Sequence, residues 1–189
     1  VREDRLKSTD KGMQNLAPIR FRETNNPDKC IVIPVVSSEK RPYIPIGFID
    51  KNTISTNGNL IIPNGDLFLF GQLTSLMHMA WVKYTCGRLK SDYRYSKDLV
   101  YNNYPFPKNV SEKQKKAVEE KAQNVLDIRA SFNDCSLADL YDPLSMPPNL
   151  KKAHQELDKA VDNCYGTKSF KNDKERIEFL FGLYEEYLG

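Results

Sequence analysis

The sequence pattern changes near residue 110, and this change constrains the fold more than any other feature of the chain. Before it, short Ile- and Val-rich runs such as CIVIPVVSS (30–38) and YIPIGFID (43–50) are separated by turn-forming residues, as in antiparallel strands. After it, apolar residues recur every three or four positions, which is the spacing of amphipathic helices. The sequence therefore predicts an α+β chain: a β-rich antiparallel part with a packed helix, then a helical part.

Turn signals divide the β-rich part. Asn57-Gly58 stands between two β-prone runs and predicts a type I′ hairpin. A second turn, Asn64-Gly65, precedes LFLF (67–70), which we interpret as a further strand. From residue 71 to residue 84 the apolar spacing changes to that of a helix, which we expect to pack on the sheet.

Helix-start signals recur in the second part. Ser111 and Gln114 form a capping-box pattern, Pro148 suits the first turn of a helix, and Asn172 with Glu175 repeats the capping pattern. Three helices are therefore expected. On the second, the residues expected to face inward are Leu150, His154, Leu157, Val161 and Cys164. On the third, they are Ile177, Leu180, Phe181, Tyr184 and Leu188.

The stretch GRLKSDYRYSKDLVYNNYPFP (87–107) combines charged and aromatic residues. If residues 88–95 form one strand, alternate side chains share a face. One face then carries Arg88, Lys90, Asp92 and Arg94. The opposite face carries Ser91, Tyr93 and Tyr95, and we expect the two tyrosines to pack behind the charged row. Lys and Arg can donate to guanine and Asp can accept from cytosine, so the row indicates a DNA-reading surface; the alternative is a solvated edge strand whose charges prevent aggregation.

The overall charge distribution agrees with an anionic partner for the first part. Residues 1–110 hold 16 Lys and Arg against 10 Asp and Glu, whereas residues 111–189 hold 12 against 15. A basic surface is therefore expected in the first part, and the acidic second part is interpreted as scaffold.

Motifs for catalysis and for ligand binding are missing from the sequence. It contains no GxGxxG, Walker, HExxH or GxSxG motif and no Asn/Asp/Ser-Pro-Pro-aromatic loop for amine methylation. Four scattered cysteines and two histidines give little support to a zinc site, and we expect reduced, buried thiols in a cytoplasmic protein. No apolar run reaches the roughly 18 residues of a membrane span. The chain is thus expected to have no catalytic, cofactor-binding or metal-binding residue of its own.

Three segments carry a resemblance to a known family: residues 87–107, LADLYDPLSMPPNLKKAHQELDKAVDNCYG (137–166) and ERIEFLFGLYEEY (175–187). Together they resemble the C-terminal part of the MmeI-like class I S-adenosylmethionine-dependent DNA methyltransferases. Residues 1–18 are polar and are interpreted as a connector from an upstream region. For the rest of the chain the resemblance implies a DNA target recognition domain at 19–108 and a C-terminal helical segment at 109–189. It also implies that the methyltransferase domain, with S-adenosylmethionine and the adenine-N6 chemistry, lies upstream in a longer restriction–modification enzyme of bacterial defence.

The same resemblance implies roles for individual residues. The positions of Lys90 and Asp92 would specify one base pair, and Arg94 would help to specify another. Apart from the resemblance, the interleaving of basic and aromatic residues makes Lys83, Arg88 and Lys97 candidates for contacts with the DNA backbone, and the loop with Asn57 and Gly58 is a further candidate. The expected partners are double-stranded DNA and the upstream methyltransferase domain. Two alternatives remain open: a protein-interaction or scaffold module, and the specificity module of a multisubunit restriction system.

Overall fold

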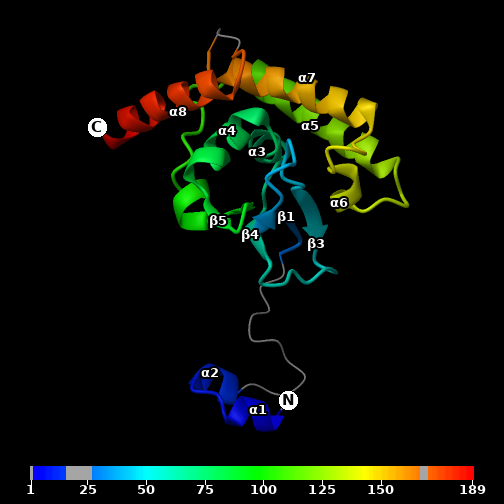
Figure 1. The fold of residues 1–189 in the computed structure, drawn as a ribbon, viewed down its shortest axis with the longest axis vertical. Helices are drawn as coiled ribbons and strands as arrows, with labels where there is room; N and C mark the ends of the chain where they lie inside the picture. Colours follow the sequence, from blue (N-terminus) through cyan, green and yellow to red (C-terminus); the bar gives the residue numbers. More distant parts are fainter. Residues whose placement is uncertain (1, 16–26, 167–169) are drawn as a thin grey trace.

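The computed structural model describes residues 2–15, 27–166 and 170–189. Two short helices, α1 (Arg2–Leu6) and α2 (Lys11–Gln14), contact each other near the N-terminus. The predicted boundary between residues 18 and 19 lies outside the described residues. The strands and the longer helices are all found between residues 29 and 188 (Figure 1).

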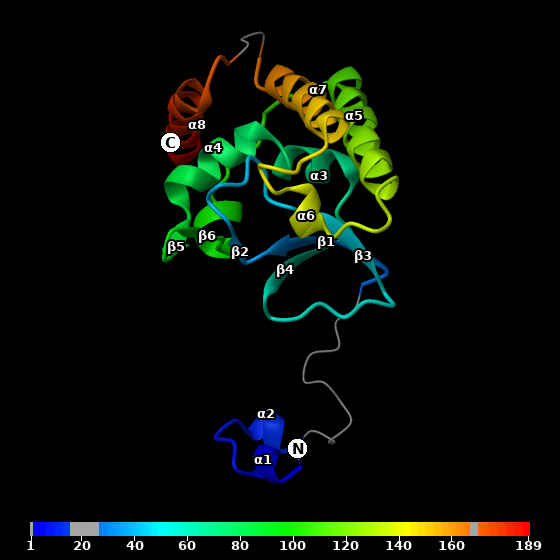
Figure 2. The same ribbon diagram turned by 45° about the vertical axis from the view of Figure 1, so that its right-hand side comes forward.

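The strands form two small antiparallel sheets, which confirms the antiparallel part of the α+β prediction (Figure 2). The first has the order β3-β1-β4, with β1 at Lys29–Pro34, β3 at Gly47–Asp50 and β4 at Asn59–Pro63. The second has the order β2-β6-β5, with β2 at Val36–Ser37, β5 at Gly87–Leu89 and β6 at Asp92–Arg94. Because only Val35 separates β1 from β2, the chain passes directly from one sheet into the other.

The other regular elements described between residues 64 and 189 are helical. In order they are α3 (Leu67–Leu73), α4 (Leu76–Thr85), the π-helical turn η1 (Lys97–Tyr101), α5 (Glu112–Ala130), α6 (Leu137–Leu140), α7 (Pro148–Cys164) and α8 (Asp173–Leu188). The capping box of Ser111 and Gln114 is present at the start of α5. The Asn172 side chain accepts from the Glu175 N–H at the start of α8. All three predicted helices of the second part are confirmed. Their starts could be predicted because capping signals involve residues close together in the sequence.

The segment LFLF is the beginning of α3, so the prediction of a strand there is wrong. Asp66 accepts from the Leu69 N–H at 2.8 Å and so caps the helix. The single helix expected over residues 71–84 is also divided, because Ser75 begins α4 by accepting from the His78 N–H. A continuous apolar run as short as LFLF fits a buried helix as well as a buried strand.

Asn57-Gly58 does not form the predicted type I′ hairpin. The strands on either side of it, β3 and β4, pair with opposite edges of β1 and not with each other. Among the residues the structure describes, neither Asn57 nor Gly58 has the positive φ that this turn requires. Asn64, in the second predicted turn, does have a positive φ of 56°.

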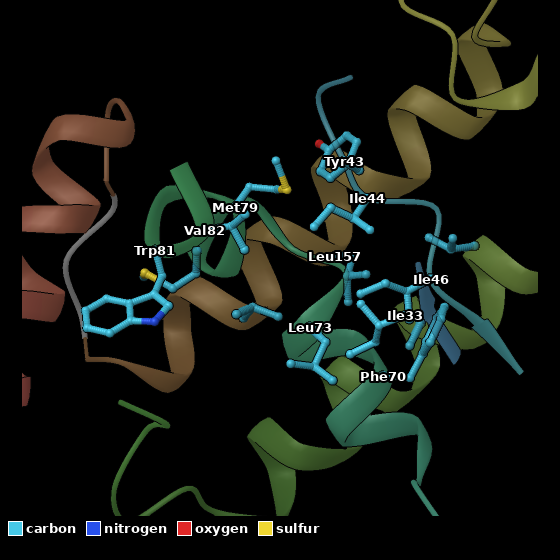
Figure 3. Packing of buried hydrophobic residues seen from close by; sticks show 14 of the residues in the cluster. Ile33, Tyr43, Ile44, Ile46, Phe70, Leu73, Met79, Trp81, Val82 and Leu157 are labelled. Carbon is cyan, nitrogen blue, oxygen red and sulfur yellow. The ribbon is translucent and has the colours of Figure 1, made fainter. Parts of the chain in front are cut away.

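One hydrophobic core runs through both parts of the chain. It joins Ile31 and Ile33 of the first sheet to Leu157 of α7, through α3 and α4 (Figure 3). The helices α5 and α7 lie side by side over α3 (Figures 1 and 2). Helix α5 approaches α3 so closely that a Cβ on Gly71 of α3 would lie 2.6 Å from Cγ1 of Val118 on α5.

Burial agrees with the predicted inner face of α7 and with only part of that of α8. The five predicted residues of α7 are buried. On α8, Ile177 and Leu180 are buried, whereas Phe181 is 43% exposed and Leu188 is 73% exposed. The prediction is therefore wrong for Leu188, in the last turn of α8, and only partly right for Phe181, whose ring packs against that of Trp81 on α4 with 5.5 Å between centroids. No helix among the described residues is long and apolar enough to cross a membrane.

Candidate nucleic-acid interface

The charged stretch forms a hairpin and not the single strand expected over residues 88–95. Strands β5 and β6 pair in antiparallel fashion, and Lys90 and Ser91 make the turn between them. Lys90 has a φ of 57°, in the left-handed region that few non-glycine residues adopt. The turn lets the segment satisfy its backbone groups by pairing with itself and with β2, which a lone strand could not do.

The hairpin changes which side chains share a face. Residues directly opposite each other in antiparallel strands point to the same side. Leu89 pairs with Asp92, and Arg94 pairs with Val36, so these four belong to one face. Arg88 pairs with Tyr93 and belongs to the other face, which corrects the expectation that it joins Asp92 and Arg94. Lys90 and Ser91 lie in the turn, so the expectation that they belong to the two faces of one strand is also wrong.

Tyr93 and Tyr95 are buried behind the outward face, with 5% and 3% of their surface exposed. Tyr95 is held from α4: its hydroxyl lies 3.0 Å from Nε2 of His78, and Nδ1 of His78 lies 2.8 Å from the Leu73 carbonyl oxygen. A carbonyl only accepts, so Nδ1 carries the proton and Nε2 accepts from Tyr95. Burial lowers the pKa of His78 to about 4, so this link is neutral near pH 7.

The three predicted base-reading residues differ in how firmly they are held. Lys90 and Arg94 are exposed, and neither side chain has a hydrogen bond or ion pair to another described residue. Asp92 is half-buried, and its Oδ1 accepts from the Glu39 N–H at 3.3 Å. The hairpin thus presents two uncommitted cations beside a carboxylate that is anchored through one oxygen.

The other predicted cations are more constrained. Lys83 forms an ion pair with Asp173 of α8. Arg88 donates to the carbonyl oxygens of Ser91 and Lys83, at 3.1 and 3.3 Å. Lys97 is exposed, and its ammonium group lies 3.6 Å from its sequence neighbour Asp98.

The loop that carries Asn57 and Gly58 is brought towards the hairpin by backbone hydrogen bonds. The Val35 N–H donates to the Gly58 carbonyl at 2.9 Å, and the Val35 carbonyl accepts from the Tyr95 N–H at 2.8 Å. Beside this junction, β4 and η1 border a groove of about 430 Å³. Its polar and aromatic lining includes Asn59, Tyr95, Lys97, Tyr101 and Asn102.

Sequence reasoning missed Glu39 and Asn59. Glu39 lies 53 positions before Asp92 and comes next to it through the pairing of β2 with β6. Asn59 begins β4 and lines the groove. Neither residue belongs to a motif, so the sequence held no local signal for them.

No cluster that could hold a metal ion is found within the described parts of the chain. Cys30 and Cys164 are buried and Cys86 is half-buried, but Cys135 is exposed. The expectation of buried thiols is therefore wrong for Cys135, which lies in the loop between α5 and α6.

Comparisons with known proteins agree with this architecture along its length. The family model for the MmeI target recognition domain matches residues 1–108, and the model for the MmeI C-terminal domain matches residues 110–189. DNA methyltransferase A of Bacillus subtilis is 46% identical over 185 residues, which are 96% of this chain and 21% of that protein.

A solved structure of the Type IIL restriction-modification enzyme MmeI in complex with DNA matches with a TM-score of 0.90 and 46% identity. The match covers all of this chain and 25% of the MmeI chain. The chain therefore spans about a fifth to a quarter of the length of these relatives. It belongs to the MmeI family, of which it comprises the target recognition and C-terminal domains.

Proposed function

We propose that this chain reads the DNA sequence at which a longer enzyme of the MmeI family transfers a methyl group to adenine N6. The observation that carries the proposal is the β5–β6 hairpin, whose turn exposes Lys90 and whose strand β6 carries Asp92 and Arg94 on one face. A two-stranded ribbon fits the major groove of B-DNA, where each base pair has its own pattern of donors and acceptors. In this proposal the chain is not catalytic by itself.

Lys90 and Asp92 would read one G·C pair. The Lys90 ammonium donates to O6 and N7 of guanine, and Asp92 accepts from N4 of the paired cytosine. Asp92 suits this role because Oδ1 is anchored by the Glu39 N–H, which leaves Oδ2 to face a base. Arg94, two positions along the same strand, would help to specify a neighbouring base pair.

Contacts with the DNA backbone would come from Lys97, Asn57 and Gly58. Lys97 is exposed on η1, and the loop with Asn57 and Gly58 is joined to the hairpin through Val35. Amide groups and a lysine ammonium suit phosphate oxygens and fix the register of a protein on DNA. We assign Lys83 and Arg88 to contacts within the chain, because both have partners there.

The remaining functions are assigned to the larger enzyme. Its upstream methyltransferase domain would bind S-adenosylmethionine and hold the extruded adenine, and this chain would bind no cofactor. The enzyme would work in the cytoplasm, on double-stranded DNA, in restriction–modification or a related bacterial defence.

The test is the paired exchange Lys90→Glu with Asp92→Arg in the full-length enzyme, followed by sequencing of the methylated sites. We expect the G·C pair at one position of the site to change, with the other positions retained. The matched control is Lys174→Glu with Glu178→Lys, which exchanges an exposed ion pair on α8 without changing net charge. An unchanged site in the hairpin variant would refute the assignment and favour a protein-interaction or scaffold role.

A further inference from the structure

We infer that Arg88 and Glu39 are positioning residues for DNA reading: they fix the turn that carries Lys90 and the orientation of Asp92. The inference rests on the proposed function of the hairpin. It concerns two residues that touch the reading residues or their turn from behind, and it explains how an exposed turn keeps one geometry.

Arg88 fastens the turn of the hairpin. Its guanidinium group donates to the Ser91 carbonyl at 3.1 Å and to the Lys83 carbonyl at 3.3 Å. It also lies 4.3 Å from the centre of the Tyr93 ring, within the range of a cation–π contact. Arg88 therefore joins the end of α4, the turn and the buried side of β6 from a single side chain.

Glu39 connects this support to the reading face. Its carboxylate lies 3.8 Å from Nη1 of Arg88, while its backbone N–H donates to Oδ1 of Asp92 at 3.3 Å. Its carbonyl oxygen accepts from the Tyr93 hydroxyl at 3.5 Å. Glu39 thus touches residues on both faces of β6: its carboxylate and its carbonyl oxygen meet Arg88 and Tyr93 on one face, and its N–H meets Asp92 on the other.

Lys90 needs such support because of its backbone. Its φ of 57° is unfavourable for a residue with a side chain, so the conformation persists only where neighbours hold it. Arg88 supplies that restraint through the carbonyl of Ser91, the second turn residue. Since two of its nitrogens already donate within the chain, Arg88 is better suited to position the turn than to grip phosphate.

The experiment uses the full-length enzyme with Arg88→Gln, Arg88→Lys and Glu39→Gln. Glu39→Gln removes the carboxylate but keeps the N–H that holds Asp92. The control is Lys40→Gln, which removes one charge from the same exposed turn. Two quantities are measured for each: methylation of a duplex library randomised across the site, and the rate of tryptic cleavage at the Lys90–Ser91 bond without DNA.

For Arg88→Gln we expect the preference at the base pair read by Lys90 and Asp92 to fall about tenfold, since one good base contact supplies discrimination of this order. Preferences at the other positions stay unchanged, and cleavage after Lys90 becomes faster. Arg88→Lys, which keeps the charge without the fork of donors, and Glu39→Gln give smaller changes in the same direction. Lys40→Gln changes neither the preferences nor the cleavage.

Each contrary result overturns the inference in a distinguishable way. A uniform loss of methylation at all sites would make Arg88 a phosphate contact. Faster cleavage with unchanged preferences would limit it to stabilising the turn. If the variant with Lys90 and Asp92 exchanged keeps the base preferences of the wild type, the proposed function fails, and the positioning role fails with it.

Discussion

The Tyr43 hydroxyl donates a 2.7 Å hydrogen bond to Oδ2 of Asp158, which joins the β-rich part of the chain to α7 across 115 positions of sequence. The other oxygen of Asp158, Oδ1, accepts from the Leu76 N–H at 2.7 Å, at the start of α4. The Tyr43 ring also stacks on His154 of α7, with 4.0 Å between ring centroids. One buried carboxylate thus holds together the loop after β2, α4 and α7, on which the hairpin is supported.

Removing the Tyr43 hydroxyl should destabilise the whole chain. In Tyr43→Phe, Oδ2 of Asp158 loses its donor in a buried site, and leaving such a group unsatisfied costs about 1–3 kcal/mol. Unfolding in urea measures this loss. Tyr84→Phe is the matched control, since Tyr84 is 61% exposed, and we expect its free energy of unfolding to change by less than about 0.5 kcal/mol.

Asp158 should make stability depend on pH in an unusual direction. Burial raises the pKa of Asp158 from 3.8 to about 7, although the bonds from Leu76 and Tyr43 and the charge of Arg176 lower it in part. Between these two values the folded state holds a proton that the unfolded state has released. The contribution of this group to stability is therefore complete below its unfolded pKa and is lost as the pH rises through 7.

The measurement is urea unfolding of the wild type and Asp158→Asn at pH 5 and pH 8. The asparagine does not titrate, so the advantage of the wild type over the variant should shrink by about 1–3 kcal/mol from the lower to the higher pH. Comparing the two proteins at each pH cancels the contributions of the other titrating groups. A difference that is constant, or that grows with pH, would contradict the raised pKa.

Two helical glycines should respond to alanine in opposite ways. At Gly71 a Cβ would meet Cγ1 of Val118 at 2.6 Å, where α3 crosses α5. We expect Gly71→Ala to destabilise the chain by about 1–2 kcal/mol, because overpacking outweighs the gain in helix propensity. At Gly182 in α8 a Cβ would have no atom within 4 Å, so Gly182→Ala should stabilise by about 0.5–1 kcal/mol. Thermal unfolding of both variants checks the signs.

Two lysines near the hairpin should separate DNA contact from structural support. Lys97→Ala should weaken binding to all duplex sequences and reduce the slope of log affinity against log salt by about 1, as expected for one phosphate contact. Lys83→Ala should leave that slope unchanged, because Lys83 is paired with Asp173 of α8. Its effect on stability should stay below about 1 kcal/mol, since the pair is partly exposed and screened. Binding titrations at several salt concentrations give both slopes.

Local signals in the sequence identified much of the helical part. The capping box at Ser111 and Gln114 and the cap at Asn172 act through residues three positions apart, so the pattern and the structure coincide. The inner face of α7 followed from helical spacing alone. LFLF could not be assigned in this way, because the Asp66 cap and the packing of α3 on α5 selected the helix.

At the candidate site, too, the sequence predicted some features of the charged stretch (87–107), and tertiary contacts decided the others. The sequence by itself determined which residue types are available there, Lys90, Asp92 and Arg94, and its family resemblance proposed them as base readers. Only the tertiary structure decided that they lie on a hairpin, that Arg88 belongs to the opposite face, and that Glu39 anchors Asp92. The physical reason is that strand pairing joins residues far apart in the chain, and such contacts leave no periodicity in the sequence.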